Sequence, residues 1–184
     1  MEYKLTTPLT KEALAPLRAG DTVRLSGVVY TARDAAHKRM MELLDEGKPL
    51  PFPVEGAAVY YVGPTPERPG QVIGAAGPTT SGRMDAYAPR LLDLGLAAMI
   101  GKGGRNEDVQ KAVVRNDAVY LAALGGAGAL MAGSVESLEI IAWEDLGCEA
   151  VRRLEVEDMP LTVILDSVGG NLYKSGPAAY LASR

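Results

Sequence analysis

The chain has 184 residues, of which 47% are hydrophobic and 23% are charged, and its net charge is −4 at pH 7. This composition suits a single domain over 1–184 and excludes both a wholly disordered chain and a basic nucleic-acid-binding surface. One cysteine (Cys148) and one histidine (His37) exclude an internal disulfide, a structural zinc site and an iron–sulfur cluster held by this chain alone.

The first part of the chain alternates helix and strand. A short helix is predicted over 10–20, ending at a glycine. The segment 22–32 is rich in β-branched residues and predicts a strand. Apolar residues at helical spacing predict a helix over 33–47, and the proline-rich segment 48–56 is expected to be a surface loop.

The next segments continue this alternation. A strand is predicted over 57–66, and a second over 71–82 that runs into a loop. A helix is predicted over 84–95, with Pro89 near its first turn.

The second half of the chain repeats the pattern. We expect a strand and a loop over 97–104 and then a helix over 106–116, with Asn106 as its N-cap. Strands are predicted over 118–124 and, after a glycine-rich turn, over 137–143.

A short helix over 144–156 and a last strand over 161–167 complete the predicted elements. Strands that alternate with short helices predict an α/β fold with a largely buried sheet.

Three positively charged residues lie where a predicted strand gives way to a helix: Arg33, Arg83 and Lys102. Ligands of α/β sheets bind outside the carboxyl ends of strands, where helix N-termini offer free N–H groups. Together with the hydroxyls of Thr79, Thr80 and Ser81, these cations predict an anion site. Two arginine forks and one lysine point charge would match a dicarboxylate. Each cation taken alone is better explained as a solvated surface residue.

His37 follows Arg33 by four residues, so both project from one face of the predicted helix. It could act as an acid–base group or orient a water molecule, and the alternative is a half-buried histidine paired with Asp34. Thr79 and Thr80 could similarly be helix caps. A threonine acts as a base only where nearby cations lower its pKa strongly.

Nucleotide binding is weakly supported, although glycine is abundant. Gly126 and Gly128 would need a third glycine where Met131 stands, and Lys102 is followed by glycine instead of serine or threonine. The dinucleotide and P-loop patterns are therefore both incomplete. Cys148 is expected to have no role in the site.

The N-terminal residues show no apolar core of a signal peptide, and no apolar stretch reaches the ~20 residues that a membrane helix needs. A single thiol fits a reducing compartment. We therefore expect a cytoplasmic protein without membrane contacts.

Four long blocks resemble the β subunit of iron–sulfur class I fumarate hydratases and L(+)-tartrate dehydratases, which is also the C-terminal domain of single-chain class I fumarases. The resemblance covers about residues 5–180. The blocks are LSGVVYTARDAAHKRM, GPTTSGRMDAYAPRLLDLGLAAMIGKG, AVYLAALGGAGALMA and AWEDLGCEAVRRLEVEDMP.

This resemblance implies a swivelling β/β/α domain, with a mixed sheet and flanking helices. It implies that Arg33, Arg83 and Lys102 grip the substrate carboxylates and that Thr79 transfers a proton. His37 matches a histidine that is a catalytic or cluster-facing candidate.

The resemblance further implies a hydro-lyase that reversibly adds or removes water at a C4 dicarboxylate, with fumarate and malate first and tartrate next. An alpha subunit would carry a [4Fe–4S] cluster, whose open iron acts as a Lewis acid on the hydroxyl, in an α2β2 assembly. The alternative is a stand-alone dicarboxylate-binding or regulatory module without its own catalysis.

Overall fold

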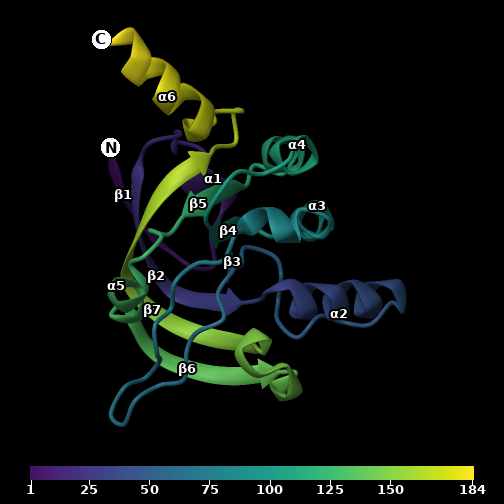
Figure 1. Ribbon diagram of the computed structural model, residues 1–184. Helices are drawn as coiled ribbons and strands as arrows, with labels where there is room; N and C mark the ends of the chain where they lie inside the picture. Colours follow the sequence, from purple (N-terminus) through teal and green to yellow (C-terminus); the bar gives the residue numbers. More distant parts are fainter.

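Four parallel strands form the centre of the sheet (Figure 1). In the computed structural model, which describes residues 1–184, they pair in the order β2 (Thr22–Thr31), β3 (Ala58–Tyr60), β4 (Ala98–Gly101) and β5 (Val119–Ala122). The long strand β7 (Val151–Leu165) runs antiparallel to both β2 and β5. It therefore closes these five strands into a ring.

Two further strands extend the sheet. β1 (Glu2–Thr6) pairs in parallel with β2, and β6 (Val135–Ala142) pairs antiparallel with β7. The sheet has seven strands of mixed direction. The prediction of an α/β fold with a mixed sheet is confirmed.

Helices α2 (Asp34–Asp45), α3 (Ala88–Asp93) and α4 (Glu107–Arg115) connect the parallel strands and stack on one side of them (Figure 1). The sequence explains two of their boundaries. The side chain of Asn106 accepts a hydrogen bond from Val109 N–H and caps α4, as predicted. Proline stands in the first turn of α3, where its missing N–H costs no helical hydrogen bond.

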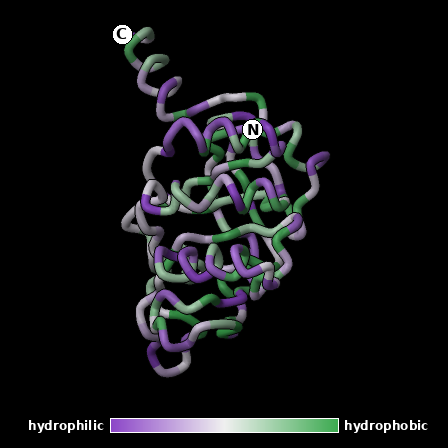
Figure 2. The backbone as a smooth tube through the Cα atoms, turned by 90° about the vertical axis from the view of Figure 1, so that its right-hand side faces the viewer, coloured by the Kyte–Doolittle hydropathy of each residue, from purple (hydrophilic) through white to green (hydrophobic).

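Alternate residues of the parallel strands enter two separate hydrophobic cores, because successive strand side chains point to opposite faces. In β3, Ala58 and Tyr60 join the core enclosed by the ring, whereas Val59 joins the core under the helices. The parallel strands are thus buried on both faces, and hydrophobic stretches (green) alternate with hydrophilic ones along the chain in Figure 2.

Two predicted elements are wrong. The segment 71–82 forms no strand, because the chain folds back on itself there: Thr65 N–H donates to Ala75 O (3.1 Å), and Ala75 N–H donates to Thr65 Oγ1 (2.8 Å). The helix predicted over 144–156 is a 3-10 helix η2 (Glu144–Glu149), interrupted at Gly147, where φ is +59°. The alternating apolar residues that follow belong to β7.

The structure adds β1 and two helices to the predicted elements, α5 (Gly128–Ala132) and α6 (Leu172–Ala182). The opening helix α1 is limited to Lys11–Leu14, shortly before Pro16. None of the α6 residues is buried, and α6 projects from the body of the molecule (Figures 1 and 2). No helix combines the length and apolar content needed to cross a bilayer.

Candidate active site

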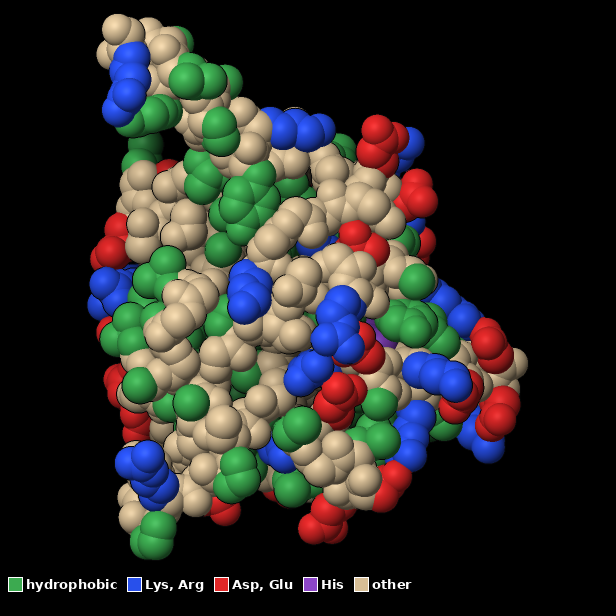
Figure 3. Space-filling view, in the orientation of Figure 1, with side chains coloured by type: hydrophobic (Ala, Val, Ile, Leu, Met, Phe, Trp, Pro, Cys, Tyr) green, Lys and Arg blue, Asp and Glu red, His purple; other side chains and the backbone are tan.

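The parallel strands end at one edge of the sheet, and two of the three predicted cations follow them there. The third, Arg83, follows no strand, because the segment 71–82 forms none and Arg83 lies in the 3-10 helix η1 (Ser81–Met84). Arg33 lies two residues after the end of β2, and Lys102 directly follows β4. Arg33 is the N-cap residue of α2. Lys102 is exposed. Lys and Arg side chains (blue) gather at the middle of the face shown in Figure 3, beside acidic ones (red).

The segment that carries Thr79, Thr80 and Arg83 is fastened to the same edge. Thr79 N–H donates to the carbonyl of Tyr61 after β3 (2.8 Å), and Thr80 forms a parallel bridge with Lys102. A Cβ at position 101 would collide with Ser81, so a glycine there lets this segment rest on the end of β4. The fold therefore brings Thr80 next to Lys102 and Thr79 to the end of β3. The predicted place of Ser81 among the anion-binding hydroxyls is wrong, because its side chain is buried against Tyr120.

A chain of ion pairs connects the two predicted arginines. Arg83 Nε donates to Asp34 Oδ1 at 2.7 Å, and Arg33 Nη2 lies 3.7 Å from Asp34 Oδ2 and 3.3 Å from Glu149 Oε1. The Arg83 side chain is 53% exposed, and its two terminal nitrogens make no hydrogen bond within the chain. Asp34 therefore orients the guanidinium and leaves the terminal nitrogens available for an anion.

Glu149 is a functional candidate that the sequence analysis passes over. Its Oε2 accepts a hydrogen bond from Ala35 N–H in the first turn of α2 (2.9 Å), while its Oε1 faces Arg33. It comes from η2, far away in the sequence. Only its position in the last of the resembling blocks could have drawn attention to it.

His37 lies beneath the charged residues and is fully buried. Its Nδ1 is 2.8 Å from Arg33 O, and because a carbonyl only accepts hydrogen bonds, Nδ1 carries the proton. Its Nε2 is buried without a partner, and the ring packs edge-on against Tyr61 with 5.4 Å between centroids. Burial lowers the pKa of His37 to about 4, so the imidazole is neutral at pH 7.

This buried histidine is expected to make stability depend on pH. Between about pH 4 and pH 6.5 the unfolded chain binds a proton at His37 that the folded chain does not, so acid favours unfolding. The free energy of unfolding should fall by about 2 kcal/mol between pH 7 and pH 5 because of this group.

Urea titrations at both pH values measure this effect. A His37→Gln variant cannot titrate at this position and should lose that part of the pH dependence. An equal pH dependence in the variant would show that other groups cause it.

Arg105 and Asp85 are further residues that the sequence analysis passes over. They form an ion pair beneath the Thr79–Arg83 segment, with 2.6 Å between Arg105 Nε and Asp85 Oδ1. Their side chains are 0% and 10% exposed. Two signals could have drawn attention to them: Asp85 lies in the second resembling block, and Arg105 directly precedes the N-cap of α4.

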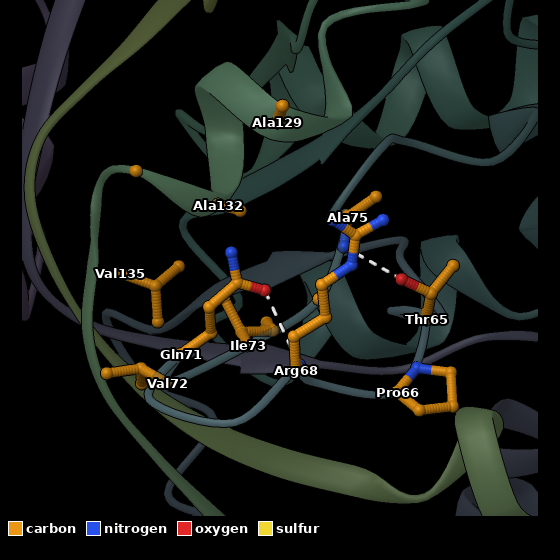
Figure 4. Close-up of a pocket in the computed structure, with 12 residues that line it drawn as sticks. Thr65, Pro66, Arg68, Gln71, Val72, Ile73, Ala75, Ala129, Ala132 and Val135 are labelled. Carbon is orange, nitrogen blue, oxygen red and sulfur yellow. Dashed lines mark hydrogen bonds between the residues drawn. The ribbon is translucent and has the colours of Figure 1, made fainter.

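A hollow of about 480 Å³ lies elsewhere, between the 64–75 loop and α5 (Figure 4). Arg68 and Gln71 extend over it from the loop, and Val135 and Ile73 form part of its apolar lining. None of the predicted site residues lines it, the adjoining hollow of about 570 Å³, or a separate hollow of about 750 Å³ beside α1. The candidate site is therefore the charged sheet edge.

The residues of this chain do not fit an iron–sulfur cluster as ligands. A cluster usually takes three or four thiolates, and the one cysteine, Cys148, is exposed. No group of three or more His, Cys, Asp or Glu side chains is arranged to hold a metal ion. No chemical step at the sheet edge is therefore assigned to a metal held by this chain.

Comparison with known proteins agrees with the family resemblance of the sequence blocks. Residues 1–176 match the family model described as the fumarase C-terminus. The chain is 36% identical over 169 residues to the aerobic class I fumarate hydratase of Escherichia coli, covering 89% of this chain and 31% of that protein.

Two further relatives support this result. The chain is 35% identical over 177 residues to fumarate hydratase 2 of Leishmania major, covering 94% of this chain and 31% of that protein. It is 38% identical over 180 residues to a proposed beta subunit of an L(+)-tartrate dehydratase from Methanocaldococcus jannaschii, covering 95% and 92%. The chain thus spans about a third of the fumarate hydratases and nearly all of the tartrate dehydratase subunit.

Proposed function

Because the chain belongs to the fumarase C-terminal family of hydro-lyases, we propose that it binds a C4 dicarboxylate and supplies part of a site that reversibly adds or removes water. Fumarate and malate are the first candidate substrates, and tartrate is the next. The domain would be of the swivelling β/β/α type. The observation that carries this proposal is the gathering of Arg33, Arg83, Lys102 and two threonines at one sheet edge.

Each residue has a role that follows from its chemistry. The terminal nitrogens of Arg83, the guanidinium of Arg33 and the ammonium of Lys102 bind the two carboxylates, with the Thr80 hydroxyl beside them. Removing a proton next to a carboxylate places additional negative charge on it, which these cations stabilise. The resemblance of the GPTTSGRMD block to the family assigns proton transfer to Thr79, a role that a threonine can fill only where nearby cations lower its pKa strongly.

His37 contributes from below the sheet edge. Its Nδ1–H holds the carbonyl of Arg33, the residue at which α2 begins, so the ring fixes the start of that helix. Because the ring is fully buried, His37 is assigned the role of a positioning residue that acts through this contact, in place of the predicted acid–base or water-orienting role.

The rest of the site would come from a partner. The residues of this chain do not fit a [4Fe–4S] cluster as ligands, so such a cluster would belong to an alpha subunit. The family resemblance implies that the two kinds of subunit would form an α2β2 assembly. Two observations support this: the related fumarate hydratases are about three times as long as this chain, and the Methanocaldococcus relative is named as a beta subunit.

The test is an anaerobic assay of fumarate hydration and tartrate dehydration. Three samples are compared: the chain alone, a purified cluster-bearing alpha subunit alone, and the two proteins combined. We expect activity only from the combination. Full activity of the isolated chain would refute the proposed division of the site. Tight succinate binding by the chain, without activity in any combination, would instead support a stand-alone dicarboxylate-binding module.

A further inference from the structure

The buried ion pair beneath the candidate site joins two of its segments. Asp85 follows η1 (Ser81–Met84) directly, and its Oδ1 accepts a hydrogen bond from Arg105 Nε at 2.6 Å. Its Oδ2 accepts another from Asn106 N–H at 2.7 Å, at the start of α4. One carboxylate therefore ties the end of the Thr79–Arg83 segment to the segment that follows Lys102.

Two aromatic rings fix the arginine of this pair. The guanidinium carbon of Arg105 lies 5.4 Å from the ring centroid of Tyr61 and 5.0 Å from that of Tyr120. Both distances allow cation–π attraction, which is stronger for a desolvated cation. The Arg105 side chain is fully buried, so its direction is set by Asp85 and the two rings.

Tyr120 makes a second connection between the same segments. Its hydroxyl oxygen lies 2.9 Å from Gly103 O and 2.9 Å from Ser81 Oγ. The carbonyl can only accept, so Tyr120 donates to Gly103 and accepts from the hydroxyl of Ser81. Ser81 adjoins Thr80, and Gly103 adjoins Lys102, so this phenol spans the two segments that carry the candidate ligands.

This network is not arranged for stability alone. Arg105 Nη2 and the Tyr61 hydroxyl are buried, and neither makes a hydrogen bond of normal geometry, which costs free energy. Buried ion pairs are often no more stable than apolar side chains of similar size. Fixing the geometry of the segments above them is a role that apolar side chains could not fill.

We propose that Arg105 and Tyr120 are positioning residues that hold the Thr79–Arg83 segment at a fixed spacing from Lys102. The inference rests on the proposed function and deepens it, because the two carboxylates of a C4 acid lie at a nearly fixed separation. Binding groups that shift by about 1 Å can reduce a rate by about 100-fold.

The test uses Tyr120→Phe in the full chain. This variant keeps the ring against Arg105 and removes only the hydroxyl. We expect succinate binding, measured by calorimetry, to weaken about 10-fold. We also expect faster hydrogen exchange at the Ser81 amide, whose N–H donates to Lys102 O (2.9 Å).

Tyr60→Phe is the matched control. Tyr60 is also a fully buried strand tyrosine, and its hydroxyl donates to the carbonyl of Ala76 within the other core. It should lower the melting temperature about as much as Tyr120→Phe does, without weakening succinate binding or speeding exchange at Ser81. Equal effects of the two variants on binding and exchange would overturn the inference.

Two more variants test the rest of the network. Ser81→Ala removes the other end of the Tyr120 contact, so Tyr120→Phe should add little to it in a double variant. Arg105→Lys keeps the charge but loses the planar fork, and it should weaken succinate binding while Lys102 and Arg83 remain. Full additivity in the first case, or unchanged binding in the second, would count against positioning.

The outcome for the proposed function can be read separately. If the wild-type chain binds no succinate, the proposed function loses its support. Hydrogen exchange then decides the inference. Faster exchange at the Ser81 amide in Tyr120→Phe but not in Tyr60→Phe supports the positioning role, and unchanged exchange in Tyr120→Phe refutes it.

Discussion

Replacing Arg83 with alanine is expected to weaken succinate binding by about 100-fold and to leave the fold intact. Hydrogen bonds to charged groups contribute about 1.5–3 kcal/mol, and each 1.4 kcal/mol changes an affinity tenfold. The side chain is about half exposed and its one ion pair, with Asp34, lies at the surface. Such pairs contribute at most about 1 kcal/mol to stability. Calorimetry of the chain, and kcat/KM for fumarate in the complex, measure the loss.

Arg90→Ala is the matched control for this prediction. The Arg90 side chain is 44% exposed and pairs with Asp45 at 2.6 Å, much as Arg83 pairs with Asp34 at 2.7 Å. Arg90→Ala removes a comparable charge and ion pair that lie away from the sheet edge. Succinate binding should therefore stay within about twofold of the wild type. A similar loss of affinity in both variants would mean that net charge, not the site, attracts the ligand.

The largest loss of stability is expected from Asp85→Ala. Removing this carboxylate leaves the guanidinium of Arg105 buried and unpaired and takes the acceptor away from Asn106 N–H. Breaking a buried ion pair by removing one partner costs about 3–5 kcal/mol. The free energy of unfolding from urea titration should fall by that amount.

Asp93→Ala provides the comparison for this prediction. Asp93 accepts two hydrogen bonds from Arg115, at 2.8 and 2.7 Å, but both side chains are about half exposed. Solvent screens this pair, so its loss should cost about 1 kcal/mol or less. If Asp85→Ala were equally mild, water would have to reach Arg105 in solution, contrary to its burial in the structure.

The candidate site could be predicted in part because its positions depend on local pattern. Arg33 and Lys102 are recognisable as the residues where strands of β-branched and apolar residues end. The N-cap Asn106 follows from its neighbours. What the pattern could not give is the environment of each side chain. Arg33 is the extended N-cap residue and does not share a helix face with His37, and the complete burial of His37 depends on Tyr61 and Tyr87 packing against it.

The sequence by itself determined the alternation of strands and helices, the α/β class and the positions of Arg33 and Lys102 after strands, because hydrophobic periodicity and capping act over a few residues. Only the tertiary structure decided which partners meet across the chain: β7 closing on both β2 and β5, Asp34 holding Arg83, and Asp85 holding Arg105. These contacts depend on strand register and on how buried charges are compensated, and neither is encoded in any single segment.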